Sequence, residues 1–317
     1  MRRDLTTPLA FATLVFFGGF NAIAAKFTLV ELAPFWSGAL RLALAAMIFI
    51  SWMVLRRYQL PRGRALQGSL AYGFLGTAAF LGLMYWALQT TPAGFAMVIL
   101  AIVPLLTTLF AAAHRLERLR PIGLLGSVVA LGGIALIASE RLGDQSASLP
   151  GLIAITLAAA AMAETNVLVK LFPRPHPVVN NAIAMTIGGV TLLALAVVTG
   201  EALALPQQTA TWAALLYLVV PGTVMLFGLF LLIIDRWSAT ATSYALLLTP
   251  LVSVLAASVL LNEPITLIFI VGAALVLGGV YVGAFAPSVG RPIPGFTRRP
   301  ALAAADGTPA QECLPGS

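Results

Sequence analysis

Residues 93–138 read AGFAMVILAIVPLLTTLFAAAHRLERLRPIGLLGSVVALGGIALIA, and residues 239–284 read ATATSYALLLTPLVSVLAASVLLNEPITLIFIVGAALVLGGVYVGA. The two stretches align without a gap at an offset of 146, and 13 of the 46 pairs are identical. Shared Leu and Ala carry little weight in apolar sequence. Rarer residues also match: Pro104 with Pro250, Glu117 with Glu263, Gly126 with Gly272, and Gly132-Gly133 with Gly278-Gly279. Their common order indicates an internal duplication.

The composition of the chain is that of a membrane protein. Of its 317 residues, 60% are hydrophobic and only 9% are charged, whereas soluble domains are about 45–50% apolar and about 25% charged. The net charge of +7 comes from basic residues in short loops between apolar runs, so it does not form the clustered patch of a nucleic-acid-binding protein. Cys313 is the single cysteine, which excludes a disulfide within the chain.

Ten apolar stretches are long enough to cross a bilayer, which takes about 20 helical residues. They are residues 8–26, 34–55, 66–89, 93–113, 121–139, 150–169, 180–199, 211–234, 240–261 and 265–285. The sequence therefore predicts an all-α membrane protein with ten transmembrane helices.

Basic residues are concentrated in alternate loops. One side of the membrane receives fifteen of the eighteen, namely Arg2, Arg3, Arg56, Arg57, Arg62, Arg64, Arg115, Arg118, Arg120, Lys170, Arg174, Arg236, Arg291, Arg298 and Arg299. The other side receives Lys26 and Arg141, and Arg41 falls inside a span. Because basic loops remain in the cytoplasm, we expect a multi-pass protein of the cell (inner) membrane with both termini cytoplasmic.

The duplication divides the spans into two groups of five. We expect a first repeat at residues 1–145, a second at 146–286, and a disordered cytoplasmic tail at 287–317, which is rich in Pro, Gly and Ala. Since five is an odd number, the second repeat crosses the membrane in the direction opposite to the first. Inverted repeats are typical of transporters that alternate between outward-open and inward-open shapes.

These features resemble those of the EamA-type transporters of the drug/metabolite transporter superfamily, over roughly residues 8–286. The motifs are Val103-Pro-Leu105 through Glu117, Thr249-Pro-Leu251 through Glu263, the Gly-Gly pairs of the fifth and tenth spans, Gly18-Gly-Phe-Asn21 followed by Lys26, and Arg41. The resemblance implies a central cavity lined by spans one to four and six to nine. It also implies small metabolites as substrates, such as amino acids, nucleobases, sugars or drugs, often exported.

The leading interpretation is a secondary active or facilitative transporter of a small metabolite, with protons as a candidate coupling ion. The chain has no GxxxxGK[ST] loop, so we expect no nucleotide and no cofactor. A flippase for a lipid-linked carrier is the alternative, with Arg41 and Lys26 beginning a basic pocket. A membrane-embedded enzyme or a metal site is disfavoured, because His114 and His176 lie in loops without a Cys or acidic partner at ligand spacing.

Glu164 is the acidic residue placed well inside a span, roughly 9 Å along the helix from Lys170. A charged side chain at that depth should face protein or a water-filled cavity. Its carboxyl group could exchange protons or bind a substrate amine, or it could pair with a basic group in a vestibule.

Other polar residues inside spans are further candidates for the substrate path. Arg41 could hold a substrate carboxylate or clamp carbonyl groups of a neighbouring helix. Asn21 and Asn166, in the paired first and sixth spans, could bind polar substrate groups or join helices. Tyr85 and Tyr244 are candidates for the cavity wall.

The duplicated Pro and Glu residues have structural interpretations. Pro104 and Pro250 occupy matching positions inside spans, where they could act as hinges or as static kinks. Glu117 and Glu263 each precede a helix start, where a carboxylate complements the positive helix terminus. We expect both to be structural.

Overall fold

Each apolar run of the sequence that the structure describes forms a helix. The computed structural model describes residues 6–116, 121–143, 145–173, 175–236 and 239–285, without side chains at 234–244, 246, 247, 284 and 285. In order, the elements are α1 (Thr6–Leu29), α2 (Pro34–Leu55), α3 (Arg64–Ala71), the π-helix η1 (Tyr72–Ala79), α4 (Phe80–Leu88), α5 (Ala93–Leu100), α6 (Val103–Ala113), α7 (Pro121–Gly143), α8 (Leu149–Leu171), α9 (Pro177–Val198), α10 (Thr209–Val219), the π-helix η2 (Val220–Met225), α11 (Leu226–Arg236), α12 (Ala239–Leu260) and α13 (Leu267–Phe285).

These elements make ten membrane spans. Among the described residues, eight helical stretches are long and apolar enough to cross a bilayer, and two shorter apolar stretches, Leu248–Leu260 and Leu267–Gly283, lie in α12 and α13. Three of the ten spans are composite, because α3–η1–α4, α5–α6 and α10–η2–α11 each cross as one unit. The predicted all-α membrane fold is confirmed.

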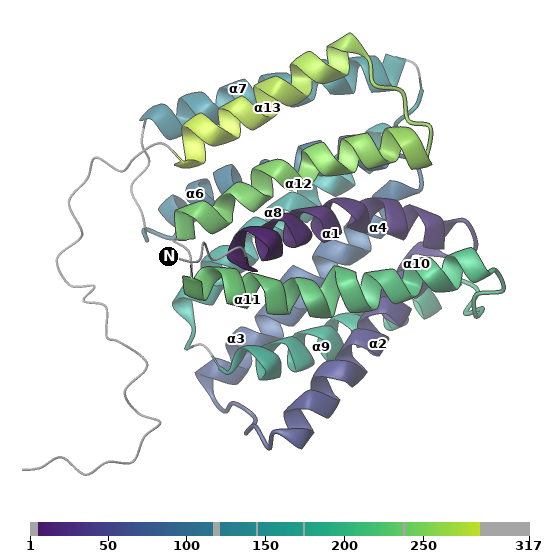
Figure 1. Ribbon diagram of the computed structural model, residues 1–317, viewed down its shortest axis with the longest axis vertical. Coiled ribbons are helices and arrows are strands. Elements are labelled where there is room, and N and C mark those ends of the chain that lie inside the picture. Colours follow the sequence, from purple (N-terminus) through teal and green to yellow (C-terminus); the bar gives the residue numbers. More distant parts are fainter. Residues whose placement is uncertain (1–5, 117–120, 144, 174, 237–238, 286–317) are drawn as a thin grey trace, which may run out of the picture. The chain divides into compact units, whose positions relative to one another are not determined.

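Helices of the first half pair with helices of the second. Figure 1 shows α7 beside α13 at one edge of the bundle and α2 beside α9 at the other. Between them, α1 packs on α12 and on α10–α11, while α8 packs on α6 and on η1–α4. Each contact therefore has a counterpart in which the two halves exchange places, as two inverted five-helix repeats require.

The duplicated glycines of α7 and α13 meet where these two helices pack against each other. A Cβ atom added at Gly126 would lie 2.5 Å from the carbonyl oxygen of Gly279, and one added at Gly133 would lie 2.5 Å from that of Gly272. Under the offset of 146, Gly126 corresponds to Gly272 and Gly133 to Gly279. The two close approaches are therefore the same contact made twice, because the absent side chains let the helix backbones touch.

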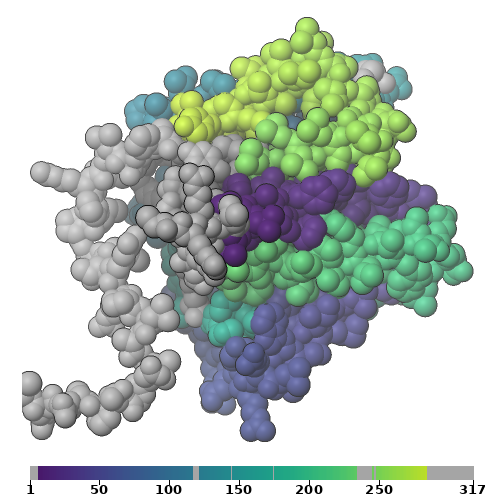
Figure 2. Space-filling model, viewed as in Figure 1, coloured from purple at the N-terminus to yellow at the C-terminus, as the bar shows by residue number. Residues whose placement is uncertain are grey.

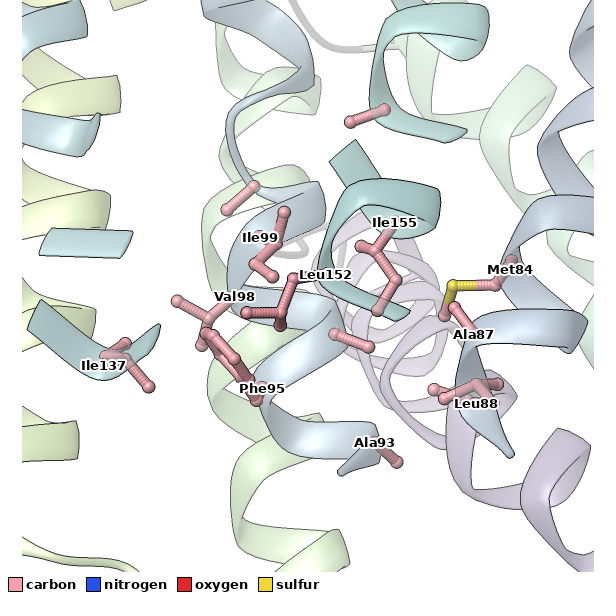
Figure 3. Packing of buried hydrophobic residues seen from close by; sticks show 14 of the residues in the cluster. Met84, Ala87, Leu88, Ala93, Phe95, Val98, Ile99, Ile137, Leu152 and Ile155 are labelled. Atoms are coloured by element: carbon pink, nitrogen blue, oxygen red, sulfur yellow. The ribbon is translucent and has the colours of Figure 1, made fainter. Parts of the chain in front are cut away.

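A buried cluster joins α4, α5 and α8 near the end of the bundle where α4 ends and α5 begins. Leu152 and Ile155 of α8 lie between Phe95 and Ile99 of α5 and Met84 of α4 (Figure 3). In lipid, such clusters are stabilised by close van der Waals packing rather than by escape from water. This packing fixes the positions of α4, α5 and α8 relative to one another, and with them the positions of the polar side chains that these helices carry.

The outward faces of the helices are apolar. Figure 2 shows α1 as a band between α12 and α10–α11 on one face of the molecule. Large apolar side chains with exposed fractions of half or more include Leu9, Val128, Leu216 and Val259. An apolar surface of this extent marks contact with another apolar phase, so the bundle is a multi-pass membrane protein.

Candidate functional site

Each half carries a π-helix in its third span. Residues 74–79 of η1 correspond to residues 220–225, which are the whole of η2, under the offset of 146. A π-helix is rare, appears as a local bulge in an α-helix, and is frequent at functional sites. The two bulges therefore mark equivalent irregular points in the two repeats.

The bulge of η2 gathers polar side chains from α1, α2 and α10. Arg41 donates through Nη2 to the carbonyl oxygen of Gly222 at 3.2 Å and to Thr223 Oγ1 at 3.2 Å. Asn21 donates through Nδ2 to the same Gly222 oxygen at 3.2 Å, and the Tyr217 hydroxyl donates to the Phe17 carbonyl at 2.9 Å. We call Asn21, Arg41, Tyr217, Gly222 and Thr223 the η2 site.

Glycine is required at the centre of the η2 site. The side-chain oxygen of Asn21 occupies the space into which a Cβ atom at residue 222 would project. Gly222 therefore lets the amide of Asn21 lie flat against the bulge, and a side chain there would displace it. The predicted candidates Arg41 and Asn21, which are 20 positions apart in the sequence, are brought together on one carbonyl group.

Glu164 has a partner that sequence spacing did not indicate. Its Oε1 lies 2.8 Å from Nε2 of His114, and the two side chains are 27% and 38% exposed. His114 follows α6 directly and Glu164 lies in α8, so the pair joins two helices across 50 residues of sequence. His114 lies in a turn as expected, and its acidic partner could not be identified from sequence spacing because that partner comes from a different span.

Asn166 lies on the same helix as Glu164 but makes a different contact. Its Nδ2 donates to Thr107 Oγ1 of α6 at 3.4 Å. Glu164 and Asn166 thus both face α6, from one end of α8. Among the described residues, no group of three or more His, Cys, Asp or Glu side chains is placed to hold a metal ion.

Glu263 caps a helix, but not the one that follows it in the sequence. Its carboxylate accepts from the backbone amides of Ala93 at 2.6 Å and Gly94 at 3.0 Å, which begin α5. The helix after Glu263, α13, begins only at Leu267. Lys26 Nζ lies 3.8 Å from Glu263 Oε1, so the carboxylate links α1, α5 and the segment before α13. Glu117 lies outside the described residues.

Two more carboxylates cap helices at this end of the bundle, which we call the α1–α2 loop end. Glu201 accepts from the amides of Phe35 at 3.2 Å and Trp36 at 2.8 Å at the start of α2. Glu31 accepts from the amides of Gln207 and Gln208, just before α10. A hydrogen bond from the Thr211 hydroxyl, aided by the two amides, holds the pKa of Glu31 below its ordinary value. None of these links between distant segments is visible as a sequence pattern.

The matched prolines occupy different local structures. Pro104 is the second residue of α6, directly after the turn at residues 101–102 that separates α6 from α5. Pro250 lies inside the continuous helix α12. Their role as hinges stays a prediction.

Of the two tyrosine candidates, the structure describes the side chain of Tyr85. Tyr85 is buried in the cluster of α4, α5 and α8, and its hydroxyl has no hydrogen-bond partner. The side chain of Tyr244 lies outside the described part of the chain.

Arg141 is a second buried arginine. It was predicted to lie in a loop beyond the fifth span, but it lies inside α7, where it donates to the Pro264 carbonyl at 2.7 Å.

A groove of about 490 Å³ lies on the flank of the bundle, away from the η2 site. Its walls are apolar side chains of α2, α4 and α8, including Phe35, Leu83, Trp86, Ile153 and Leu157. This lining offers almost no hydrogen-bonding group to a polar solute, and the groove is open rather than enclosed. It suits an apolar chain better than a polar metabolite.

Comparisons with known proteins agree with this architecture. The EamA-like transporter family matches the chain twice, at residues 6–139 and 149–284. An uncharacterized transporter of Synechocystis sp. is 26% identical over 287 residues, covering 84% of this chain and 86% of that protein. The uncharacterized inner membrane transporter YedA of Escherichia coli is 29% identical over 224 residues, covering 70% of this chain and 72% of YedA.

A solved crystal structure has the same fold. It superposes with a TM-score of 0.61 at 21% identity and covers 88% of this chain and 96% of its own. The two family matches each span one of the five-helix repeats. The chain therefore belongs to the EamA-like transporter family and is a multi-pass membrane transporter.

Proposed function

We propose that this protein is a secondary transporter that moves a small polar metabolite across the cytoplasmic membrane by alternating access, in the direction of export. The observation that carries the proposal is the pairing of every span with a counterpart in the opposite half, including the twice-made glycine contact of α7 with α13. Halves related in this way can exchange conformations, which opens a central path to one side and then to the other. The count of basic residues supports placing the α1–α2 loop end outside the cell, with both termini inside.

Carboxylates hold the α1–α2 loop end together: Glu31, Glu201 and Glu263 each accept from backbone amides of a distant segment. At the opposite end, where residues 117–120, 174 and 237–238 lie outside the described part of the chain, Glu164 and His114 are partly exposed. The carboxylate links support a state that is closed at the outer side, and the exposure of Glu164 supports its access from the cytoplasm.

Glu164 and His114 are the proposed site of proton exchange. Imidazole is the side chain whose protonation changes within the physiological pH range. At 2.8 Å, a proton shared with the carboxylate of Glu164 can be held or released without breaking the backbone hydrogen bonds of either helix. Because a carboxyl group inside a span is costly unless it faces protein or water, its partial exposure fits a role in the ion path.

Flux through purified protein in proteoliposomes tests the proposal. A panel of radiolabelled amino acids, nucleobases and sugars would be offered with and without a proton gradient. We expect at least one of these solutes to be transported, and we expect Glu164→Gln to lower its gradient-driven flux by about tenfold or more. Glu140→Gln is the matched control, because Glu140 also lies in a span but bonds only Thr266.

The outcomes separate the parts of the proposal. Equal gradient-driven flux in Glu164→Gln and in the wild type would exclude Glu164 from proton coupling. Absence of flux for every solute would overturn the proposed transport of small metabolites.

A flippase for a lipid-linked carrier is the second candidate, and the lateral apolar groove favours it. An acyl or polyprenyl chain could lie along Leu83 and Ile153 in contact with the bilayer. The groove lacks a basic residue, so the phosphate of such a carrier would need another site. Scrambling of a fluorescent lipid-linked carrier in the same vesicles, without solute flux, would support this candidate.

A further inference from the structure

The two π-helices provide an internal comparison for the role of Arg41. Gly222 corresponds to Gly76 at the offset of 146, whereas α2 and α9 begin at Pro34 and Pro177, an offset of 143 that aligns Arg41 with Ala184. At η1, Ile187 packs against Gly73, and Thr77 Oγ1 donates to the carbonyl oxygen of Ala184 at 2.9 Å. The fold therefore builds the bulge of η1 with a hydroxyl group and an aliphatic side chain where η2 has a guanidinium.

The same comparison holds for the side chain that covers each central glycine. A Cβ atom added at Gly76 would lie 2.7 Å from Thr165 of α8, whereas one added at Gly222 would meet Asn21 of α1. The Thr165 hydroxyl donates to the carbonyl oxygen of Ala161 in its own helix and not to the bulge. The neutral site at η1 needs neither a cation nor an amide to keep its shape, so packing alone does not account for Arg41.

Arg41 carries a charge without a counter-ion in the described part of the chain. Neither the Lys26–Glu263 pair nor the His114–Glu164 pair involves Arg41. Arg41 is only 8% exposed and lies seven residues into α2, roughly 10 Å below the start of the helix. A cation inside a span is costly unless it is paired or faces water. An anion from outside the chain would neutralise it.

One edge of the guanidinium is free to receive that anion. Nε and Nη2 are directed at Gly222 and Thr223, and no described group accepts from Nη1. Nη1 is also not among the buried atoms that are sealed without a partner, in contrast to Nη1 of Arg141. Nε and Nη2 thus fix the orientation of the guanidinium, and Nη1 is left to donate a charge-assisted hydrogen bond to a carboxylate oxygen.

We propose that the η2 site binds the carboxylate of the transported solute, with Arg41 as the residue that recognises it. This inference rests on the proposed transport function and assigns its substrate class as small monocarboxylates, which include amino acids and hydroxy acids. A monoanion is favoured over a phosphate, because Arg41 supplies one positive charge and the nearest span cation of α1, Lys26, is engaged with Glu263. A dianion would leave a net negative charge within the membrane.

Binding to the purified full-length protein in detergent tests the assignment. Radiolabelled α-amino acids, lactate, inorganic phosphate, glucose and uracil would be screened, and each amino acid or lactate that binds would be compared with its primary amide. We expect the wild type to bind a carboxylate at least about tenfold more tightly than the corresponding amide. The comparison needs no variant, so it holds even if substitution impairs folding.

Variants at η2 and at η1 then locate the preference. Arg41→Met should abolish the discrimination between acid and amide, and Arg41→Lys should retain part of it, because an ammonium keeps the charge but lacks the guanidinium geometry that Gly222 and Thr223 hold in place. Ile187→Met, at the contact of α9 with η1, is the control in the other repeat and should bind like the wild type. Discrimination that survives Arg41→Met, or an amide that binds as well as its acid, would overturn the proposal.

Flux distinguishes this inference from the function on which it rests. Transport of a neutral sugar or nucleobase that is insensitive to Arg41→Met would support the proposed transport function but reject the carboxylate site. Preference for phosphate over every carboxylate would reject the monocarboxylate class. Absence of both binding and flux for every solute in the screen would reject the proposed function itself.

Discussion

At the residue scale, Glu263 shows how one carboxylate can hold several segments. It accepts two backbone amides of α5 and also pairs with Lys26. Loss of a capping side chain costs about 0.5–2 kcal/mol, whereas a partly exposed ion pair is worth about 0–1 kcal/mol. The capping bonds therefore outweigh the ion pair, whose atoms lie 3.8 Å apart with Lys26 26% exposed.

This ranking gives a prediction for the two partners. Glu263→Ala should lower the free energy of unfolding by about 1–2 kcal/mol, and Lys26→Met should lower it by less than about 1 kcal/mol. Thermal unfolding of the purified variants in one detergent would measure both changes. A larger loss for Lys26→Met than for Glu263→Ala would show that the ion pair, not the cap, secures α5.

At the scale of elements, the seam between α7 and α13 depends on which glycine of each pair faces the partner helix. A Cβ atom added at Gly133 would meet the backbone of Gly272, but one added at Gly132 would meet nothing within 4 Å. Gly279 and Gly278 divide in the same way. Only one glycine of each pair is therefore needed for the close approach, and the other is a helix position where Gly is less favourable than Ala.

Adjacent substitutions test this division. Gly133→Ala should destabilise the protein by about 1–3 kcal/mol, because the backbone of α13 must move away. Gly132→Ala should be neutral or stabilising by up to about 1 kcal/mol, because Ala has the higher helix propensity. Melting temperatures of the two variants and of Gly279→Ala and Gly278→Ala would check both halves. Equal effects at neighbouring positions would contradict the observed seam.

At the scale of the whole molecule, the side chains of Glu31 and Glu201 link distant segments at the α1–α2 loop end. Glu31 joins the α1–α2 loop to the start of α10, and Glu201 joins the loop after α9 to the start of α2. Each link thus connects the first repeat with the second. Protonation of Glu31 would therefore weaken a contact between the repeats rather than a contact within one of them.

Glu31 makes this dependence measurable. The hydrogen bond from Thr211 and those from Gln207 and Gln208 lower its pKa, so its contribution to stability is present above the ordinary value of 4.5 and is lost as the pH falls through the lowered value. We expect the melting temperature of the wild type to fall more steeply below about pH 4.5 than that of Glu31→Gln. Parallel curves for the two proteins would exclude Glu31 from the link.

The chain alone specifies the features that depend on composition and order. Apolar runs of bilayer length produced spans such as 34–55 and 93–113, which coincide with α2 and with α5–α6. The offset of 146 predicted the duplicated halves, and the odd number of spans in each predicted their inversion. These properties can be predicted from the sequence because the length and charge of a segment are local, and because the duplicated residues recur at a fixed distance along the chain.

The partners of the polar side chains follow only from the tertiary structure. Arg41 reaches Gly222 across 181 residues, Glu263 caps α5 across 169 to 170 residues, and His114 meets Glu164 across 50 residues. Uniformly apolar spans have no polar face from which such contacts could be predicted, and the π-helices that expose the Gly222 carbonyl have no sequence signature. A hydrogen bond between spans depends on depth, rotation and distance together, and packing sets all three.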